Sequence, residues 1–390
     1  MISGRGDEYL ESEFPSVPIY LVGGKNGAKN VDLRETNLLS LSYGNIVPKD
    51  IDSHKGLLPA SFDGYQVVQP GYTILRFTDL QNDQKSLRSG LVTERGIITS
   101  AYIGFKPDTR LVAPAYFAYV MRALDVRKAF YQMGFGVRQS LGWDEFSAIR
   151  IPLPDLDTQR RIADYLDTEV GEMDAMVARL EKLIADLEER RSVRIADALR
   201  RAGAEPIRVN LLAQLKTGGT PKNVTTSDGG VSWVKPEDLS VDSVGLLIDD
   251  HFAEQLPIVS AGSALFCGIG SSLAKVGFAQ RSLVTNQQIT ALIPRSGVNG
   301  KLLYYSLQSM RQRIHSIAPR STMPIFNNVR LGNEPILFLD DGQQDSVVAE
   351  LDDESAAIDG IIDRSRTLID DLKARKSALI TEVVTGRKQV

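Results

Sequence analysis

The chain has 390 residues, 43% of them hydrophobic, and a formal net charge of −4 at pH 7, so we expect two or three globular domains and no uniformly basic nucleic-acid coat. No apolar run reaches the roughly 18 residues that a membrane helix needs, the polar N-terminus does not resemble a secretory signal, and the single Cys267 excludes an internal disulfide. We therefore expect a cytoplasmic protein, and no metal site, because the three histidines and Cys267 have no metal-ligand spacing.

Charge alternates along the chain. Residues 85–150 carry 10 basic and 5 acidic side chains, a net charge of +5, and residues 206–335 carry 12 and 8, a net charge of +4. The three segments around these blocks are acidic. Separated basic blocks are compatible with two polyanion-binding surfaces, although an imbalance of this size also arises by chance.

The first 150 residues are predicted to form a mixed domain. Short β-branched runs at 65–68, 73–77 and 96–105 are divided by Gly, Pro and Asn-Asp turns, which is typical of strands. An aromatic-rich stretch at 115–124 has helical spacing, so its rings are expected in the core. We predict an α+β domain with a curved sheet and a few helices.

Two spacer segments, residues 151–205 and 336–390, are each predicted to contain a long helix. Residues 166–201 and 351–386 align without a gap at an offset of 185, and neither stretch contains proline. We expect helices of about 36 residues, or about 54 Å at 1.5 Å per residue.

The apolar residues of the first helix alternate at spacings of four and three, and those of the second helix have the same register with Ser365 at one position, which is typical of a coiled-coil seam. The seam residues are Met173, Val177, Leu180, Ile184, Leu187, Ile358, Ile362, Ile369 and Leu372. Each seam needs a partner, so we expect the two helices to pair antiparallel. Asp157 is expected to be the N-cap of the first helix, and Gly203 and Gly386 are expected to stop the two helices.

Residues 206–335 repeat the first mixed domain more weakly. TNQQITALIP at 285–294 corresponds to TSAYIGFKP at 99–107, and GSALFCGI at 262–269 resembles GYTILRF at 71–77. The full repeat is therefore a mixed domain followed by a long helix, used twice. A single chain with such a pseudo-two-fold repeat can imitate a dimer and read two DNA half-sites.

Catalytic motifs are absent from the sequence. There is no P-loop and no GxSxG elbow, and GIGSSLA at 268–274 has Leu273 at the third glycine position of a dinucleotide loop. KPDTRL at 106–111 faintly resembles a nuclease core, but it has acid-x-Arg where acid-x-Lys is needed. The chain is predicted to be a binding and assembly protein.

One loop carries most of the functional signal. GGTPKNVTTSDGGVSWVKPEDLS at 218–240 fits a phosphate-cradling loop, a nucleic-acid-reading loop or ordinary turns between strands. Together with TNQQITALIP at 285–294 and with IPLPDLDTQRRIADYLD at 151–167, which leads into the first long helix, it resembles the DNA specificity subunits of type I restriction–modification enzymes. The resemblance covers about residues 30–390. The first domain departs from it, because it lacks the GGTP element and has NLLSLSYGNIVPKD at 37–50 where the family often has a Trp-containing strand.

The resemblance implies a subunit that is not an enzyme. It would bind a bipartite asymmetric site on double-stranded DNA with one recognition domain per half-site, and its helices would set the spacing and dock two methyltransferase subunits that bind S-adenosylmethionine. Restriction subunits with ATPase and nuclease activity, which use ATP and Mg, would join that core, and this chain would itself bind no cofactor. Two alternatives stay open: a coiled-coil adaptor whose domains bind ligands other than DNA, and a DNA-modifying enzyme with a divergent active site.

Candidate DNA contacts combine close backbone approach at glycines with lysine charge and threonine hydroxyls. In the second domain they are Lys216, Thr217, Thr220, Lys222, Lys235, Asn286, Arg320 and Ser321. In the first domain they are Arg76, Arg95, Lys106, Arg138, Gln139 and Ser140. The alternatives are glycines that only form hairpin turns, a buried structural amide at Asn286, and backbone caps at 138–140 and 320–322. Trp233 is expected in the core rather than stacked on a base.

Overall fold

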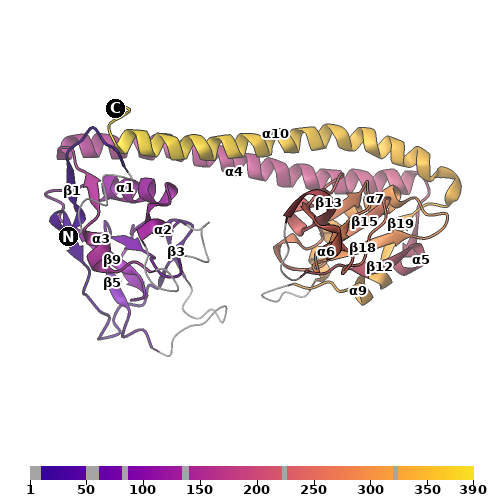
Figure 1. Cartoon of the computed structure of the whole chain (residues 1–390), viewed down its shortest axis with the longest axis horizontal. Coiled ribbons are helices and arrows are strands. Elements are labelled where there is room, and N and C mark those ends of the chain that lie inside the picture. Colours follow the sequence, from indigo (N-terminus) through magenta and orange to yellow (C-terminus); the bar gives the residue numbers. More distant parts are fainter. Residues whose placement is uncertain (1–9, 50–60, 81–86, 134–139, 222–225, 319–323) are drawn as a thin grey trace. The chain divides into compact units, whose positions relative to one another are not determined.

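The computed structural model describes residues 10–49, 61–80, 87–133, 140–221, 226–318 and 324–390. The chain divides into two compact units: unit 1 comprises residues 1–179 and 368–390, and unit 2 comprises residues 180–367. Each unit contains a mixed domain and a segment of both long helices, α4 (Leu156–Arg201) and α10 (Gln344–Val384) (Figure 1). The two predicted spacer segments therefore contain these helices, but each helix is shared between the units.

The mixed domain of unit 1 is built on a four-stranded antiparallel sheet. Its order is β2 (Gly23–Lys25), β9 (Ile103–Pro107), β6 (Thr73–Leu75) and β7 (Ser89–Leu91). Three two-stranded pairs accompany it: β1 (Ser16–Pro18) with β10 (Arg150–Pro152), β3 (Leu39–Ser42) with β4 (Asn45–Pro48), and β5 (Gln66–Val68) with β8 (Gly96–Ile98). The helices are α1 (Pro114–Val126), α2 (Ala129–Met133), α3 (Trp143–Ser147) and the 3-10 helix η1 (Ile19–Leu21).

Unit 2 also contains a four-stranded antiparallel sheet, in the order β12 (Ala213–Thr217), β18 (Ile289–Pro294), β15 (Ser263–Cys267) and β16 (Val276–Ala279). A three-stranded sheet orders β14 (Leu246–Ile248), β13 (Thr226–Val234) and β17 (Val284–Thr285), and β11 (Glu205–Arg208) pairs with β19 (Pro335–Phe338). The helices are α5 (Val209–Leu212), α6 (Asp250–Ala253), α7 (Gly300–Ser309), α8 (Arg311–Ile317), α9 (Asn328–Asn333), η2 (Pro236–Asp238), η3 (Gly270–Ser272) and η4 (Asp341–Gln343).

The predicted internal repeat is confirmed by the topology. The four-stranded sheets have the same order, so β2, β9, β6 and β7 of unit 1 correspond to β12, β18, β15 and β16 of unit 2. In each unit the last strand of this sheet in the sequence, β9 or β18, is followed by a helix that carries buried aromatic rings, α1 or α7. The α+β class and the duplication predicted from sequence are therefore correct.

Two hydrogen-bonding side chains recur at the 185-residue offset. The buried amide of Gln159 at the start of α4 accepts from N of Ala113 (2.8 Å), and the buried amide of Gln344 at the start of α10 accepts from N of Asn299 (2.7 Å). Asp167 accepts from the Tyr119 hydroxyl (2.7 Å), as Asp352 does from the Tyr305 hydroxyl (2.5 Å). The same pair of contacts thus attaches each long helix to the helix of its own mixed domain.

Aromatic side chains form much of the core, as predicted. In unit 1, Tyr116 and Phe117 of α1 are fully buried, and the ring of Phe117 stacks on Phe105 with centroids 4.1 Å apart. In unit 2, Tyr304 and Tyr305 of α7 are buried in the same way. The core of unit 1 extends to residues of α4 and α10, so the helix segments are part of the folded unit.

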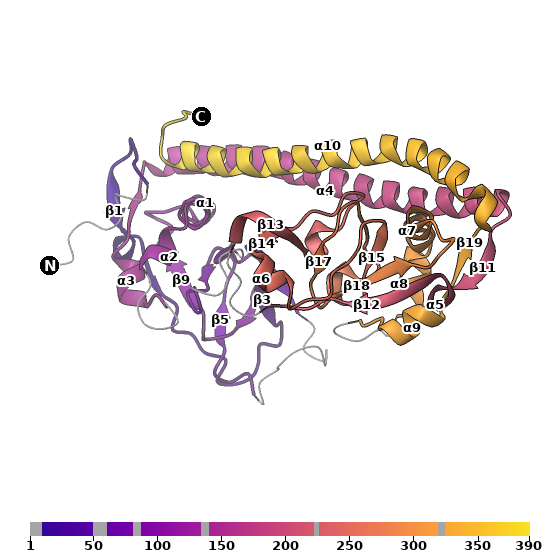
Figure 2. The same ribbon diagram turned by 45° about the vertical axis from the view of Figure 1, so that its right-hand side comes forward.

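The long helices run antiparallel, as predicted. In unit 2, Arg191 pairs with Asp359, and Nη2 of Arg201 lies 3.5 Å from Oε1 of Glu350. Because the residue numbers rise in one helix segment as they fall in the other, the chains point in opposite directions. Figures 1 and 2 both show α10 lying along α4. None of the helices in the described part of the chain combines the length and apolarity of a membrane span.

The predicted seam residues lie on the inner side of the helices. All nine are buried or half-buried: Met173, Val177, Leu180, Ile184, Leu187, Ile358, Ile362, Ile369 and Leu372. By contrast Met176, Leu183, Ile361 and Leu368, which lie on the same helices, are between 37% and 45% exposed. Burial therefore follows the four-three spacing.

The helix boundaries differ in part from the prediction. The prediction of Asp157 as N-cap was wrong: α4 begins at Leu156, and Oδ1 of Asp155 accepts hydrogen bonds from N of Asp157 (3.1 Å) and N of Thr158 (3.0 Å), which is the bonding of an N-cap. The stops are confirmed, because Gly203 and Gly386 follow the helices with φ angles of 82° and 80°, a conformation that favours glycine.

A buried carboxylate in unit 1 makes stability depend on pH. Asp125 of α1 is 1% exposed; its Oδ2 accepts from N of Arg88, and its Oδ1 has no hydrogen-bond partner among the described residues. Burial raises the pKa of Asp125 to about 6, against the opposing effects of the Arg88 N–H and the Arg122 charge. The folded state therefore binds this proton more tightly than the unfolded chain does.

We expect Asp125→Asn to remove this pH dependence. Protonated Asp125 stabilises the fold fully below the pKa that it has in the unfolded chain, and this stabilisation is lost as the pH rises through about 6. The free energy of unfolding should fall by about 3 kcal/mol over this range, at about 1.4 kcal/mol per pKa unit. At pH 7.5 the variant should therefore be more stable than the wild type, and at pH 4 about equal to it. Urea unfolding between these values, with the exposed Asp164→Asn as control, measures the difference; parallel profiles for wild type and Asp125→Asn would contradict it.

Candidate nucleic-acid interface

The candidate interface in unit 2 is formed where β12, β13 and β17 end. The N–H of Gly218, directly after β12, donates to O of Ile289 (3.0 Å), and the N–H of Gly219 donates to O of Thr285 (2.8 Å). A Cβ atom at Gly218 would overlap the carbonyl oxygen of Thr285. Gly218 is therefore needed for close packing of the loop on the turn after β17, and not only for a hairpin.

The side chain of Trp233 bonds to the same loop. It is 7% exposed, which confirms its predicted place in the core, and its Nε1 donates to O of Gly219 (3.2 Å). Nζ of Lys235 lies 5.1 Å from the centre of the Trp233 ring, a distance at which a cation is attracted to the face of the ring. The aromatic ring thus holds a lysine beside the glycine loop.

Asn286 lies in the turn between β17 and β18. β17 ends at Thr285 and β18 begins at Ile289, and Oδ1 of Asn286 accepts from N of Gln288 (2.8 Å). The Asn286 side chain is half-buried and supports the turn, whereas Gln287 is exposed at its tip.

Asn328 is a member of this edge that sequence reasoning missed. Its Nδ2 donates to Oγ1 of the exposed Thr217 (2.7 Å), and its Oδ1 accepts from Oγ1 of Thr290 (2.5 Å). Asn327 before it is the N-cap of α9 and accepts from N of Arg330 (3.0 Å). An Asn-Asn pair at the start of a helix was the available signal, because a cap needs only one of the two side chains.

The edge therefore gathers five of the predicted contacts, Lys216, Thr217, Thr220, Lys235 and Asn286. Lys216 and Lys235 are half-buried, and Thr217 and Thr220 are exposed. Lys222, Arg320 and Ser321 lie outside the described residues. In Figures 1 and 2, β12 and α9 lie on the side of unit 2 away from its segments of the long helices, so those segments leave the edge uncovered.

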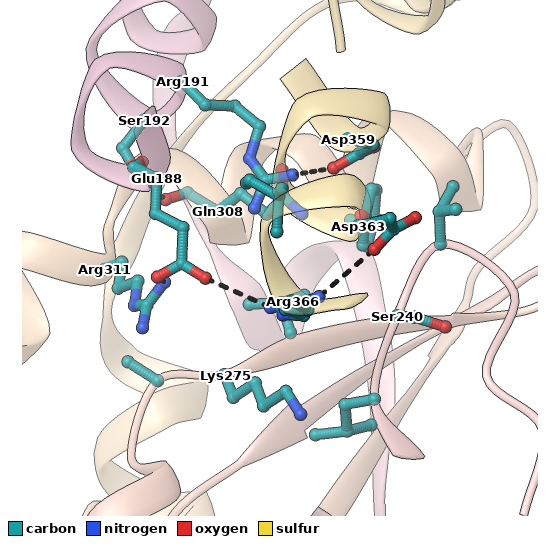
Figure 3. Close-up of a pocket in the computed structure, with 16 residues that line it drawn as sticks. Glu188, Arg191, Ser192, Ser240, Lys275, Gln308, Arg311, Asp359, Asp363 and Arg366 are labelled. Atoms are coloured by element: carbon teal, nitrogen blue, oxygen red, sulfur yellow. Dashed lines mark hydrogen bonds and ion pairs between the residues drawn. The ribbon is translucent and has the colours of Figure 1, made fainter. Parts of the chain in front are cut away.

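A second polar region of unit 2 has a different character. A cavity of about 150 Å³ lies between α4, α10 and the mixed domain (Figure 3). Glu188 accepts from Arg311 (2.6 Å) and lies 3.6 Å from Arg366, and Arg191 pairs with Asp359. Nζ of Lys275 donates to two backbone oxygens at 2.9 Å, and burial lowers its pKa. The cations around the cavity all bond to groups of unit 2. These contacts join the mixed domain to the helices, so the cavity is not a candidate polyanion site.

The predicted contacts of unit 1 do not gather in the same way. Arg76 follows β6 and Lys106 lies on β9, toward opposite ends of the β6–β9 ladder. Arg95 lies 2.7 Å from Glu35, and this hydrogen bond lowers the pKa of the Glu35 carboxyl. Ser140 is exposed, and Arg138 and Gln139 lie outside the described residues. All of these positions stay predictions.

Comparison with known proteins gives matches at the level of structure. No protein-family model matches the chain, and no curated protein matches its sequence. One solved chain, from work on complex assembly and conformational transition of the type I R-M system, is 16% identical, with a TM-score of 0.61 over 96% of this chain and 98% of that chain.

The chain shares the fold of that solved structure.

Two further solved chains match at lower TM-scores. The HsdS subunit from Thermoanaerobacter tengcongensis is 16% identical, with a TM-score of 0.44 over 97% of this chain and 98% of that chain. The type I restriction-modification system S subunit from M. genitalium is 12% identical, with a TM-score of 0.41 over 95% and 96%. The match with a TM-score of 0.61 spans both mixed domains and both long helices.

Proposed function

We propose that this chain is the DNA specificity subunit of a type I restriction–modification enzyme. It has no catalytic role of its own and reads a bipartite, asymmetric target with one mixed domain for each half-site. The observation that carries the proposal is the fold shared over nearly the full length with a chain of a type I R-M system. The two domains repeat one four-stranded sheet, but their other strands pair differently, which suits two readers of different sequences.

The edge of unit 2 supports a role in DNA binding. Its lysines supply charge for phosphates, and the exposed Thr217 and Thr220 supply hydroxyls that bond to phosphate or sugar oxygens. The exposed Gln287 has an amide suited to the edge of adenine. Because backbone bonds and the Trp233 N–H already fix the loop, little ordering entropy is lost when DNA binds.

The long helices supply a surface for two copies of one partner, which we propose are methyltransferase subunits. Met176 and Ile361 are exposed at matching repeat positions, and so are Leu183 and Leu368. Exposed apolar side chains repeated at one offset offer two similar contacts. S-adenosylmethionine would bind to these subunits, and ATP and Mg to restriction subunits that join the assembly.

Selection from a random library of DNA duplexes tests the proposal. We expect the full-length chain to enrich two short conserved blocks separated by a spacer of fixed length and free sequence, and we expect affinity to fall steeply with salt, because phosphate contacts release counterions. Enrichment of no sequence, with no salt-dependent binding, would favour the adaptor alternative. Methyl transfer by the chain without partners would favour the DNA-modifying alternative.

A further inference from the structure

The shared topology identifies the loop of unit 1 that corresponds to the loop after β12 in unit 2, which begins with Gly218 and Gly219. β2 and β12 are equivalent edge strands: Gly23 pairs with Pro107 as Ala213 pairs with Pro294. β2 ends at Lys25, two residues before the position in this register at which β12 ends. The next residue, Asn26, donates its N–H to O of Gly104 (2.7 Å), as Gly218 does to O of Ile289. The loop that begins with KNGA at 25 therefore follows the same strand of the sheet as the loop that begins with TGGT at 217, and it leaves that strand two residues earlier.

Amide side chains bond this loop to the neighbouring strand. Nδ2 of Asn26 donates to Oε1 of Gln66 (3.2 Å) and to O of Val67 (2.9 Å), and Oδ1 of Asn26 accepts from N of Ala28 (3.2 Å). Gln66 is 5% exposed, and its Nε2 donates to two backbone oxygens. A Cβ atom at Gly104 would overlap Oε1 of Gln66. Hydrogen bonds of the Asn26 side chain therefore attach this loop to β5.

The surface above these amides is open and basic. A cavity of about 300 Å³ is lined by Lys25, Gly27, Ala28 and Lys29 of the loop and by Ser100 and Tyr102. Both lysines are exposed, no carboxylate is among the described residues that line the cavity, and neither lysine pairs with a described carboxylate. Lys25 and Lys29 therefore differ from Arg95, whose charge is matched by Glu35.

We propose that the loop from Lys25 to Asn30 binds phosphate groups of the DNA backbone at the half-site read by unit 1. The inference rests on the proposed function and adds to it a site that none of the predicted contacts included. Lysine is a compact point charge that attracts phosphate without reading bases. The loop therefore sets the position and affinity of unit 1 on DNA, and other residues read the sequence. In Figures 1 and 2, β5 beside this loop lies on the side of unit 1 away from its helix segments.

A charge-removal pair tests the site. The full-length chain carrying Lys25→Ala and Lys29→Ala is compared with wild type on the duplex that wild type selects, over a range of salt concentrations. We expect the slope of log K against log salt to fall by about 1.8, at about 0.9 per phosphate contact, and affinity at low salt to fall about tenfold or more. The selected sequence should stay unchanged. Lys25→Arg with Lys29→Arg should keep the slope, and Arg160→Ala with Arg161→Ala, on the exposed surface of α4, controls for total charge.

A charge-addition pair gives an independent measurement at an unhindered position. A Cβ atom at Gly27 would meet no atom within 4 Å, so Gly27→Asp and Gly27→Asn should both fold, with equal melting temperatures. Gly27→Asp should weaken DNA binding several-fold more than Gly27→Asn. Unchanged slope and affinity in the lysine pair, with wild type binding its target, would overturn this inference and leave the proposed function standing. Failure of wild type to bind any duplex would overturn both.

Discussion

Replacement of Ile369 by aspartate should destabilise the folded chain by about 3 to 5 kcal/mol, because an unpaired carboxylate in an apolar environment is costly. Ile369 lies on the predicted seam of α10 and is 6% exposed. Ile184, the corresponding seam residue of α4, is only half-buried and would give a smaller effect. Urea unfolding followed by far-ultraviolet circular dichroism measures the change.

The neighbouring Leu368 supplies the matched control. It is 45% exposed, so Leu368→Asp introduces the same charge one residue away on the outer face of the helix. We expect that variant to lie within about 0.5 kcal/mol of wild type, as surface substitutions usually do. Equal destabilisation by the two substitutions would show that helix propensity or net charge, and not burial in the seam, causes the effect.

The seam could be predicted from the sequence because the apolar residues of a coiled coil recur at spacings of four and three within a single helix. The lengths could not: α4 and α10 have 46 and 41 residues instead of about 36. The first turns of α4 bury Gln159, Ile162, Ala163 and Leu166. This is the wider face of a helix that packs on a globular domain, so the four-three pattern begins only after it.

The candidate interface shows a different limit of sequence reasoning. Glycines, lysines and threonines marked the loop after β12, because these residue types suit close approach to phosphate. The partners of that loop are distant in sequence: Asn328 is 111 residues from Thr217, and Gln66 is 40 residues from Asn26. Only strand register brings them together. The equivalent loop of unit 1 lacks the GGTP letters, and topology alone identifies it.

Addition of one heptad to both long helices should lengthen the spacer of the DNA target. Asp174 faces Lys376, so the antiparallel register places the bond after Arg179 opposite the bond after Asp370. Insertion of seven residues at both points keeps the seam in phase and adds about 10.5 Å at 1.5 Å per residue. DNA rises about 3.4 Å per base pair, so a duplex that runs along the helices should be read with about three more base pairs between its half-sites.

The added base pairs also rotate one half-site by about 100° relative to the other, at about 10.5 pairs per turn, so we expect lower affinity together with the longer spacer. Selection from a random duplex library identifies the spacing, and deletion of one heptad at the same two points should shorten the spacer by about three base pairs. An insertion in α4 alone separates the effect of length from that of pairing, because it leaves seven residues without a partner and should lower stability before it changes the target. Recovery of both half-sites at their original spacing with full affinity in the doubly extended chain would show that the helices do not set the distance.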